Sequence, residues 1–432
     1  MNTSPMNTAQ LLALDAWQLS TLLTRRELKA EALVRACLER ITEREDTVHA
    51  FAQLDPDAAL TTARALDAGP VRGLLHGLPI GVKDLFDTAD FATTYGSNVY
   101  AGYRPRADAS PVALCREAGA VVLGKTVSTE FAYFTPGPTR NPHNTAHTPG
   151  GSSSGSAAAV ADLMLPLALG TQTAGSIIRP AAYCGVVGFK PSLGRVASGG
   201  VKSLSQTMDI VGGFGRSVRD VGLLGAVLTG DARLSGWSEA VMPRIGFFQT
   251  PSWPQADADV GRAWEHATRA LSAQAKDCQD VATPLNFGDL IQLQKDVMTF
   301  EMARALSHER IHHRERLSAP LNSLLDDGMA MTGARHAEQL AMVADWRQRI
   351  DALFERHDVL LTPSTTGIAP EGTATGDPLF CRSWSILGLP SVHLPFTTGK
   401  NGLPVGLQLV GRFGQDQHLL AAAQWVHERL KE

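Results

Sequence analysis

The sequence lacks a long apolar run: in its 432 residues, no stretch of about 18 apolar residues occurs without interruption. Its first twenty residues, MNTSPMNTAQLLALDAWQLS, also lack the basic segment that opens an export signal. We therefore expect no membrane span and no export.

Cysteine is scarce. The five cysteines are Cys37, Cys115, Cys184, Cys278 and Cys381, which lie far apart and form no C-x-x-C pair. Their odd number and spacing argue against a disulfide framework and against a zinc site. Reduced thiols are typical of a cytoplasmic protein, and we expect neither a metal nor a cofactor.

A long basic stripe is also absent, and the formal net charge is -4. The sequence therefore does not indicate nucleic acid as a partner. Hydrophobic residues make up 44% of the chain and charged residues 19%, a balance that indicates a globular enzyme-like protein rather than a disordered or fibrous one.

Helical and extended apolar patterns alternate along the chain. Residues 9–45 read as two helices, and short apolar runs at 78–82 and 120–123 read as buried strands on either side of a helix at 110–118. This rhythm predicts an α/β fold with a sheet covered by helices. Further strands are expected at 244–248, 358–361, 391–394 and 405–410, and further helices at 57–67, 258–273, 287–315, 334–357 and 415–430.

The stretch from Thr148 to Pro191 is dense in glycine, serine and other small residues: TPGGSSSGSAAAVADLMLPLALGTQTAGSIIRPAAYCGVVGFKP. It contains Ser152 after two glycines and Ser176 after Ala-Gly, with an apolar run between them. A backbone without bulky side chains can bring its N–H groups close to a ligand. The apolar filling distinguishes the stretch from a flexible linker, so it predicts a catalytic loop system.

Three blocks resemble one family. GGSSSGSAAAVA followed by LGTQTAGSIIRPAAYCGVVGFKP resembles the serine- and glycine-rich signature of the amidase signature family of amide hydrolases. GLPIGVKDLFDT at 77–88 resembles the lysine strand of that family, and NGLPVGLQLVG at 401–411 resembles its C-terminal strand. The resemblance implies a central twisted mixed β-sheet surrounded by helices. We expect a helical N-terminal extension over 1–60 and a single catalytic domain over 61–432.

Amide hydrolysis needs an activated nucleophile and N–H donors for the developing oxyanion. Ser176 is the candidate nucleophile, because it follows a segment whose small residues leave the N–H groups free to point at one oxygen. The resemblance implies that this oxyanion hole is formed by Thr173, Ala174, Gly175 and Ser176.

Lys83 is the candidate base. It adjoins apolar residues at 79–82, and desolvation of its ammonium would lower its pKa until it can accept a proton. The resemblance implies a triad of Lys83, Ser152 and Ser176, in which Ser152 follows a cis peptide bond and relays the proton. We expect Ser153 and Gly151 to lie beside the substrate. Lys125, Lys190 and Asp84 are expected to have structural roles.

A rival reading is the nucleophile elbow of α/β-hydrolases, G-x-S-x-G at 151–155, with Asp358 and His393 as partners. That elbow requires a strand directly before it, but a polar, proline-containing segment at 140–149 precedes it here. The histidine pairs His143/His147 and His312/His313 lack carboxylates at metal-ligand spacing.

The signature departs from the common family pattern, because Gln172 replaces an aspartate and Ile178 takes the place of an arginine, with Arg179 next to it. TQTAGSIIRP resembles the malonamidase-like branch, whose substrates are small amides that carry a carboxylate. Arg179 could bind such a carboxylate or hold loop carbonyls. Phe131, Tyr133 and Phe134 are candidates to line the entrance, which would suit an apolar or aryl amide.

The expected partner is thus a small-molecule amide. Two alternatives of a different kind are an A-type subunit of a tRNA amidotransferase, which would need partner proteins, and a non-enzymatic paralogue. The first is disfavoured by Gln172 and Arg179, and the second by the presence of all three triad residues. The N-terminal helices are a candidate surface for a homodimer.

Overall fold

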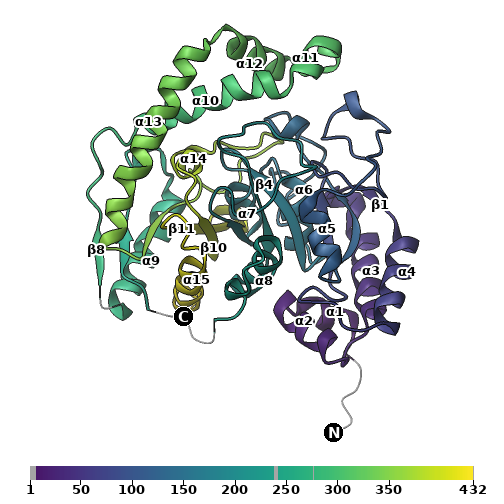
Figure 1. Ribbon diagram of the computed structural model, residues 1–432. Coiled ribbons are helices and arrows are strands. Elements are labelled where there is room, and N and C mark those ends of the chain that lie inside the picture. Colours follow the sequence, from purple (N-terminus) through teal and green to yellow (C-terminus); the bar gives the residue numbers. More distant parts are fainter. Residues whose placement is uncertain (1–5, 238–241, 276, 432) are drawn as a thin grey trace.

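A computed structural model describes residues 6–237, 242–275 and 277–431. Its strands form one mixed sheet in the order β1-β3-β2-β4-β6-β5-β10-β11-β9-β7-β8. The strands are β1 (Phe51–Leu54), β2 (Pro79–Lys83), β3 (Val121–Thr126), β4 (Leu167–Gln172), β5 (Val187–Lys190), β6 (Ile210–Gly215), β7 (Ile245–Phe247), β8 (Cys278–Asp280), β9 (Val359–Pro363), β10 (Ser391–Thr398) and β11 (Pro404–Gly411). The predicted α/β class with a large mixed sheet is confirmed (Figure 1).

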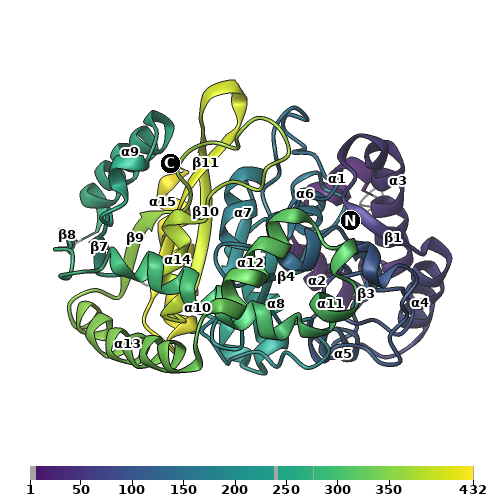
Figure 2. The same ribbon diagram turned by 90° about the horizontal axis from the view of Figure 1, so that it is seen from above.

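Helices surround this sheet (Figure 2). They are α1 (Thr8–Ala13), α2 (Ala16–Thr24), α3 (Ala30–Val48), α4 (Pro56–Ala68), α5 (Ser110–Glu117), α6 (Ser154–Ala161), α7 (Ile178–Cys184), α8 (Val218–Thr229), α9 (Ala258–Gln274), α10 (Asp289–Ala305), α11 (Ser307–His312), α12 (Ala319–Ala330), α13 (Gly333–Asp351), α14 (Leu379–Ile386) and α15 (Asp416–Leu430). None of these helices combines the length and the apolar character needed to cross a bilayer.

Three parallel strands organise the part of the sheet that matters for function. β2 pairs in parallel with β3 on one side and with β4 on the other, so their carboxyl ends meet at the same edge. All residues of these three strands are buried. This edge carries Lys83 at the end of β2 and Thr171 near the end of β4.

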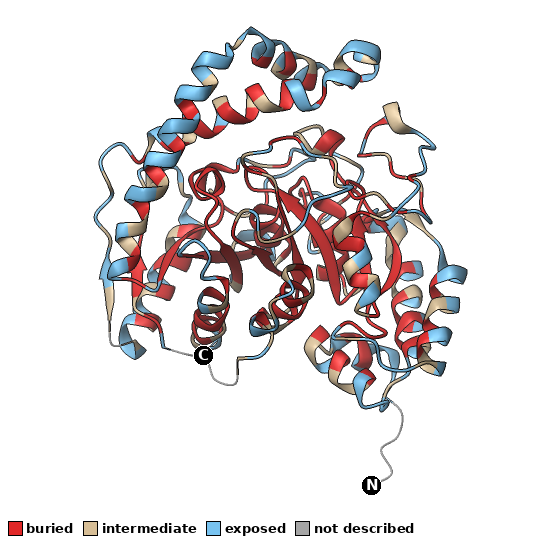
Figure 3. Cartoon of the chain, viewed as in Figure 1, coloured by how far each residue is buried: buried red, intermediate tan, exposed pale blue. Residues whose placement is uncertain are grey.

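An arm of helices, α10 to α13, arches over the rest of the chain (Figure 1, green). Much of its outer surface is exposed, whereas the sheet below it is buried almost throughout (Figure 3). α10 contacts α14, which joins the arm to the body. The arm therefore stands above a sheet that is already fully covered.

The N-terminal segment differs from the expected helical extension. Three helices replace the predicted two, because Asp15 caps α2 and interrupts the helical run. Residues 51–54 form β1, an antiparallel partner of β3 at the edge of the sheet. This short strand shows no alternating apolar pattern, which explains why the sequence did not predict it. Residues 1–5 and 432 of the expected segments lie outside the described residues.

Helix α6 begins directly after the serine-rich loop and approaches the backbone of neighbouring segments very closely. A Cβ atom on Gly155 would lie 2.1 Å from the Ala50 carbonyl oxygen and 2.4 Å from the Val127 nitrogen. Only glycine fits there, because backbone atoms on both sides cannot move independently. Gly155 thus fixes the position of α6 and of the serines before it.

Gly155→Ala should therefore lower the free energy of unfolding by about 1–3 kcal/mol, the usual cost of overpacking. Gly261→Ala in α9 is the matched control, because a Cβ there meets no atom within 4 Å. That control should be neutral or should stabilise the protein by roughly 0.5–1 kcal/mol. Urea unfolding curves of both variants measure the difference, and equal stability would contradict the proposed role of Gly155.

Candidate active site

Lys83 lies at the carboxyl end of β2 with its side chain fully buried. Its Nζ atom is 2.7 Å from Ser152 Oγ and 2.7 Å from Thr171 Oγ1. Burial lowers the pKa of Lys83 to about 7, although the negative charge of Asp209 acts in the opposite direction. A lysine with a pKa of about 7 is neutral in a substantial fraction of molecules at neutral pH, and that neutral form can accept a proton.

Ser152 lies in a loop whose backbone is unusual at two successive positions. Gly150 has a φ of 79°, and the bond between Gly151 and Ser152 is a cis peptide, as the family resemblance implied. A Cβ on Gly150 would lie 3.0 Å from Pro180 Cα. The Thr129 N–H donates to the Ser152 carbonyl oxygen at 3.2 Å. Glycine at position 150 is needed both for the positive φ and for this close approach.

Ser153 has a structural role rather than the expected place beside the substrate. Its side chain is fully buried. Its hydroxyl donates to the Thr171 carbonyl oxygen at 3.3 Å and accepts from the Thr171 N–H at 3.4 Å. These contacts attach the serine loop to β4 next to Lys83.

Ser176 lies in the turn between β4 and α7, and Gln172 determines the shape of that turn. Gln172 Oε1 accepts from the Ile177 and Ile178 N–H groups at 2.8 and 3.0 Å. Gln172 Nε2 donates to Ser385 Oγ, which in turn donates to the Ala174 carbonyl oxygen at 2.7 Å. A neutral amide therefore satisfies the donors of the turn at the position where the common family pattern has an aspartate.

The Ser176 side chain faces a cavity of about 360 Å³, counted to its open mouth. The cavity lies between the serine turn and α10 and is lined by Ala132, Tyr133, Phe134, Thr173, Ala174, Ser176, Arg179, Leu204, Met298 and Met302. Sequence reasoning identified Tyr133 and Phe134 but missed the two methionines, which come from α10 more than a hundred residues later. No local motif marks them.

Phe131 is a correction to the sequence-based expectation. It is fully buried, packs edge-on against Tyr100 and does not line the cavity. Phe131 and Ala132 both have positive φ values, 44° and 52°, which turn the chain so that Phe131 points into the core. Non-glycine residues rarely adopt this conformation, and the sequence does not announce it. Phe134 occupies the cavity wall instead.

Arg179 is buried beside Ser176, and its guanidinium holds two loop carbonyls. Nη1 donates to the Gly376 oxygen at 2.8 Å and Nη2 to the Gly151 oxygen at 2.7 Å. The Arg179 Nε atom is buried without a hydrogen-bond partner among the described residues. The guanidinium carbon also lies 5.7 Å from the centre of the Phe134 ring. Arg179 therefore joins the Ser176 turn to the cis-peptide loop.

The hydroxyls of Ser152 and Ser176 are not joined by a hydrogen bond in the part of the chain that is described. Lys83 and Ser152 are in direct contact. Thr171, near the end of β4, also contacts Lys83, and Thr173 follows β4 in the segment that leads to Ser176. The Lys83–Ser152 half of the triad is thus visible as a contact, whereas the step to Ser176 belongs to the proposed mechanism.

The nucleophile-elbow reading does not fit the structure. No strand comes directly before Ser153, because the residues immediately ahead of it form a loop. His393 Nδ1 lies 2.7 Å from the Ser364 hydroxyl, while Asp358 pairs with Arg244 at a partly exposed position. Within the described residues, no group of three or more histidine, cysteine or carboxylate side chains is placed to hold a metal ion.

The other buried lysines have structural partners, as predicted. Lys125 Nζ contacts Asp84 at 3.1 Å and donates to the Thr93 hydroxyl. Lys190 donates to the Leu389 carbonyl oxygen. Burial lowers the pKa of Lys190 to about 7 as well, so a depressed pKa alone does not single out the base. The contact with a serine hydroxyl does.

The buried lysine in contact with the serine loop, next to the serine turn, is the arrangement expected of an amide hydrolase. Comparison with known proteins agrees. The family model described as Amidase matches residues 32–420. The chain belongs to this family, the amidase-signature hydrolases of amide C–N bonds.

Individual relatives support the same assignment. The A-type component of the glutamyl-tRNA(Gln) amidotransferase of Acidothermus cellulolyticus is 33% identical over 95% of this chain and 93% of its own length. A solved amidase is 33% identical, with a TM-score of 0.89 over 96% of this chain and 100% of that chain. The peptide amidase of Stenotrophomonas maltophilia is 30% identical, with a TM-score of 0.83 over 97% of each chain.

The burial of Lys83 leads to a prediction about pH. For amide hydrolysis, kcat/KM should rise with pH with a midpoint near the Lys83 pKa of about 7, because only the neutral amine accepts a proton. Lys190→Met is the control, since its amine is buried like that of Lys83 but contacts a backbone carbonyl. The midpoint should stay in place in folded Lys190→Met protein. If the midpoint shifts in Lys190→Met protein, the titration belongs to Lys190 and not to Lys83.

Proposed function

We propose that this protein hydrolyses a small-molecule carboxylic amide through an acyl-enzyme on Ser176, with Lys83 and Ser152 as the proton relay. The observation that carries this proposal is the buried Lys83 amine, 2.7 Å from the Ser152 hydroxyl. A lysine with a pKa of about 7 is a base matched to neutral pH. Its two neighbours are hydroxyl groups rather than carboxylates, so the neutral form is favoured.

The first half of the reaction forms the acyl-enzyme. Ser176 Oγ bonds to the amide carbon while its proton passes through Ser152 to neutral Lys83. The resulting oxyanion accepts hydrogen bonds from the N–H groups of the 173–176 segment. The same proton returns through Ser152 to the leaving nitrogen, the C–N bond breaks, and ammonia or an amine departs.

The second half regenerates the enzyme. A water molecule gives up a proton to the relay and bonds to the acyl carbon. The bond to Ser176 Oγ breaks, Ser176 recovers that proton through Ser152, and the carboxylic acid product leaves and gives its own proton to solvent, becoming the carboxylate. No cofactor enters this scheme.

The proposed substrate is a small amide with an anionic group on its acyl side, as in the malonamidase-like branch. Arg179 lines the cavity beside Ser176, and no carboxylate lies within ion-pair distance of it among the described residues. Two of its five N–H donors hold loop carbonyls, so others can serve a substrate carboxylate. The apolar wall formed by Tyr133, Phe134, Met298 and Met302 supports the alternative, an apolar or aryl amide.

A component of a tRNA amidotransferase is the second candidate, because curated relatives of that kind match nearly the whole chain. The Gln172 and Arg179 departures disfavour it. Ammonia release by the isolated chain over a panel of amides separates the two. Turnover of small amides without a partner supports the amidase, whereas activity on glutamine that appears only with captured partner proteins supports the amidotransferase component.

We also propose a cellular location and an assembly state. We infer a cytoplasmic protein, because the five cysteines are free and four of them are buried. A homodimer is expected, and light scattering of the purified chain measures it directly.

The relay predicts the effect of removing each serine and the lysine. Ser176→Ala and Lys83→Ala should abolish hydrolysis, and Ser152→Ala should lower kcat by on the order of 10²–10⁴-fold, the range for general acid–base groups. Ser154→Ala is the matched control, because its buried hydroxyl donates to the Val127 carbonyl oxygen instead. Chelators should have no effect. Wild-type turnover by folded Ser176→Ala protein would refute the mechanism.

Arg179 predicts a contrast between substrates. Arg179→Ala should lower kcat/KM for every amide, because Gly151 and Gly376 lose their donor. For monoamides of short dicarboxylic acids the loss should be greater by roughly 1.5–3 kcal/mol, the range for a hydrogen bond to a charged group. Steady-state kinetics on matched charged and neutral amides measure this excess. Equal losses would limit Arg179 to loop support and would direct attention to Tyr133 and Phe134.

A further inference from the structure

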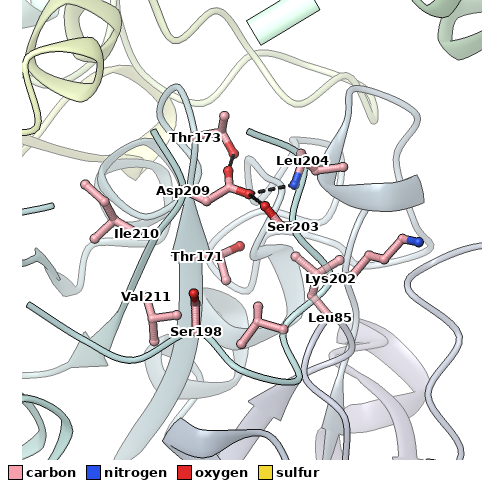
Figure 4. A pocket seen from close by; sticks show the side chains of 11 residues that line it. Leu85, Thr171, Thr173, Ser198, Lys202, Ser203, Leu204, Asp209, Ile210 and Val211 are labelled. Atoms are coloured by element: carbon pink, nitrogen blue, oxygen red, sulfur yellow. Dashed lines mark hydrogen bonds between the residues drawn. The ribbon is translucent and has the colours of Figure 1, made fainter. Parts of the chain in front are cut away.

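A second cavity next to the Ser176 turn is lined by a half-buried carboxylate, Asp209, that the mechanism above does not use. Asp209 lies just before β6 and lines this cavity together with Thr171 and Thr173 (Figure 4). Thr173 lines both cavities. Asp209 therefore lies beside a residue that also lines the substrate cavity.

Asp209 accepts hydrogen bonds from two directions. One oxygen, Oδ1, accepts from the Thr173 hydroxyl at 2.5 Å. The other, Oδ2, accepts from the Ser203 hydroxyl and from the N–H groups of Leu204 and Ser205 at 3.0, 2.6 and 3.0 Å. The carboxylate thus joins the first residue of the oxyanion segment to the 203–205 turn.

The 203–205 turn is itself held from above by the helical arm. Glu301 of α10 accepts from the Ser205 hydroxyl and from the Thr207 N–H. Leu204 lines the substrate cavity beside Met298 and Met302 of the same helix. Asp209 therefore connects Thr173 to the 203–205 turn. That turn is hydrogen-bonded to Asp209 on one side and to Glu301 on the other.

We propose that Asp209 is a positioning residue for amide hydrolysis: it holds Thr173 of the oxyanion segment through the side chain and places a negative charge on the Lys83 side of the site. This inference rests on the proposed function. It accounts for a carboxylate that accepts from four donors, two of which belong to Thr173 and Leu204, residues that line the substrate cavity.

The charged groups around Lys83 make the second half of this role testable. The direct neighbours of Lys83 Nζ are the Ser152 and Thr171 hydroxyls, which are neutral. The charge that acts on the Lys83 pKa is that of Asp209, which raises it against the effect of burial. Lys202 also lines the second cavity, but its amine points away from Asp209 (Figure 4) and pairs with Glu309.

Asp209→Asn is the central test. An amide cannot accept on both sides, so either Thr173 or the 203–205 turn loses its acceptor, and kcat should fall by roughly ten- to a hundredfold. Loss of the negative charge lowers the Lys83 pKa, and the rising limb of the pH profile should move to lower pH. The rate at which a fluorophosphonate phosphonylates Ser176, with loss of fluoride, gives the same midpoint against pH without an amide substrate.

Asp220→Asn is the matched control. Asp220 is a buried aspartate, but it accepts from the backbone N–H groups of Trp17, Arg216 and Ser217, away from both cavities. This variant should lose stability and leave the pH midpoint unchanged. If Asp209→Asn leaves the midpoint in place, or behaves like Asp220→Asn in kcat and midpoint, the inference is overturned.

Thr173→Val keeps the test decisive if Asp209→Asn does not fold. It removes the hydroxyl and leaves the carboxylate with its other three donors, so kcat should fall while the pH midpoint and the unfolding temperature stay the same. Unchanged kcat would overturn the positioning role. Wild-type protein that neither hydrolyses amides nor reacts with the fluorophosphonate would refute the proposed function, a result distinct from both outcomes above.

Discussion

The desolvation of one amine governs the design of this site. Lys83 is enclosed by the sheet and meets two hydroxyls instead of a carboxylate. A carboxylate in direct contact would hold the lysine in its charged form, and the proposed base would be lost. The serine loop and the close approach of α6 at Gly155 both place Ser152 against this amine. The conformation of this backbone therefore keeps an uncharged hydroxyl beside Lys83.

Gln172 lies where the common family pattern has an aspartate. The turn is therefore built here without the charge of that aspartate. Gln172 satisfies two N–H groups with one oxygen and reaches Ser385 with its amide nitrogen. A neutral residue so close to Ser176 leaves Asp209 and Arg179 as the charged groups that flank the turn. Their charges have opposite signs: Asp209 binds the Thr173 hydroxyl, and Arg179 binds the carbonyl oxygens of Gly151 and Gly376.

The sequence predicted the contact between Lys83 and Ser152 but not the residues that surround it. The motif blocks named Lys83, Ser152 and Ser176 because glycine, serine and lysine at these positions are tied to local backbone shape. Asp209 could not be found in this way, because it comes next to Thr173 only when β6 returns antiparallel to β4, pairing Ile210 with Gln172. Phe131 was misplaced for a related reason, since a left-handed turn at non-glycine residues leaves no trace in the sequence.

The two walls of the substrate cavity belong to different parts of the structure. The floor belongs to the buried sheet and the serine turn, where a change of one atom disturbs packing on all sides. The roof is supplied by two flexible methionine side chains of α10, in an arm whose other face meets solvent. Substitutions at these two methionines can therefore change the shape of the cavity without touching the Lys83–Ser152 contact below.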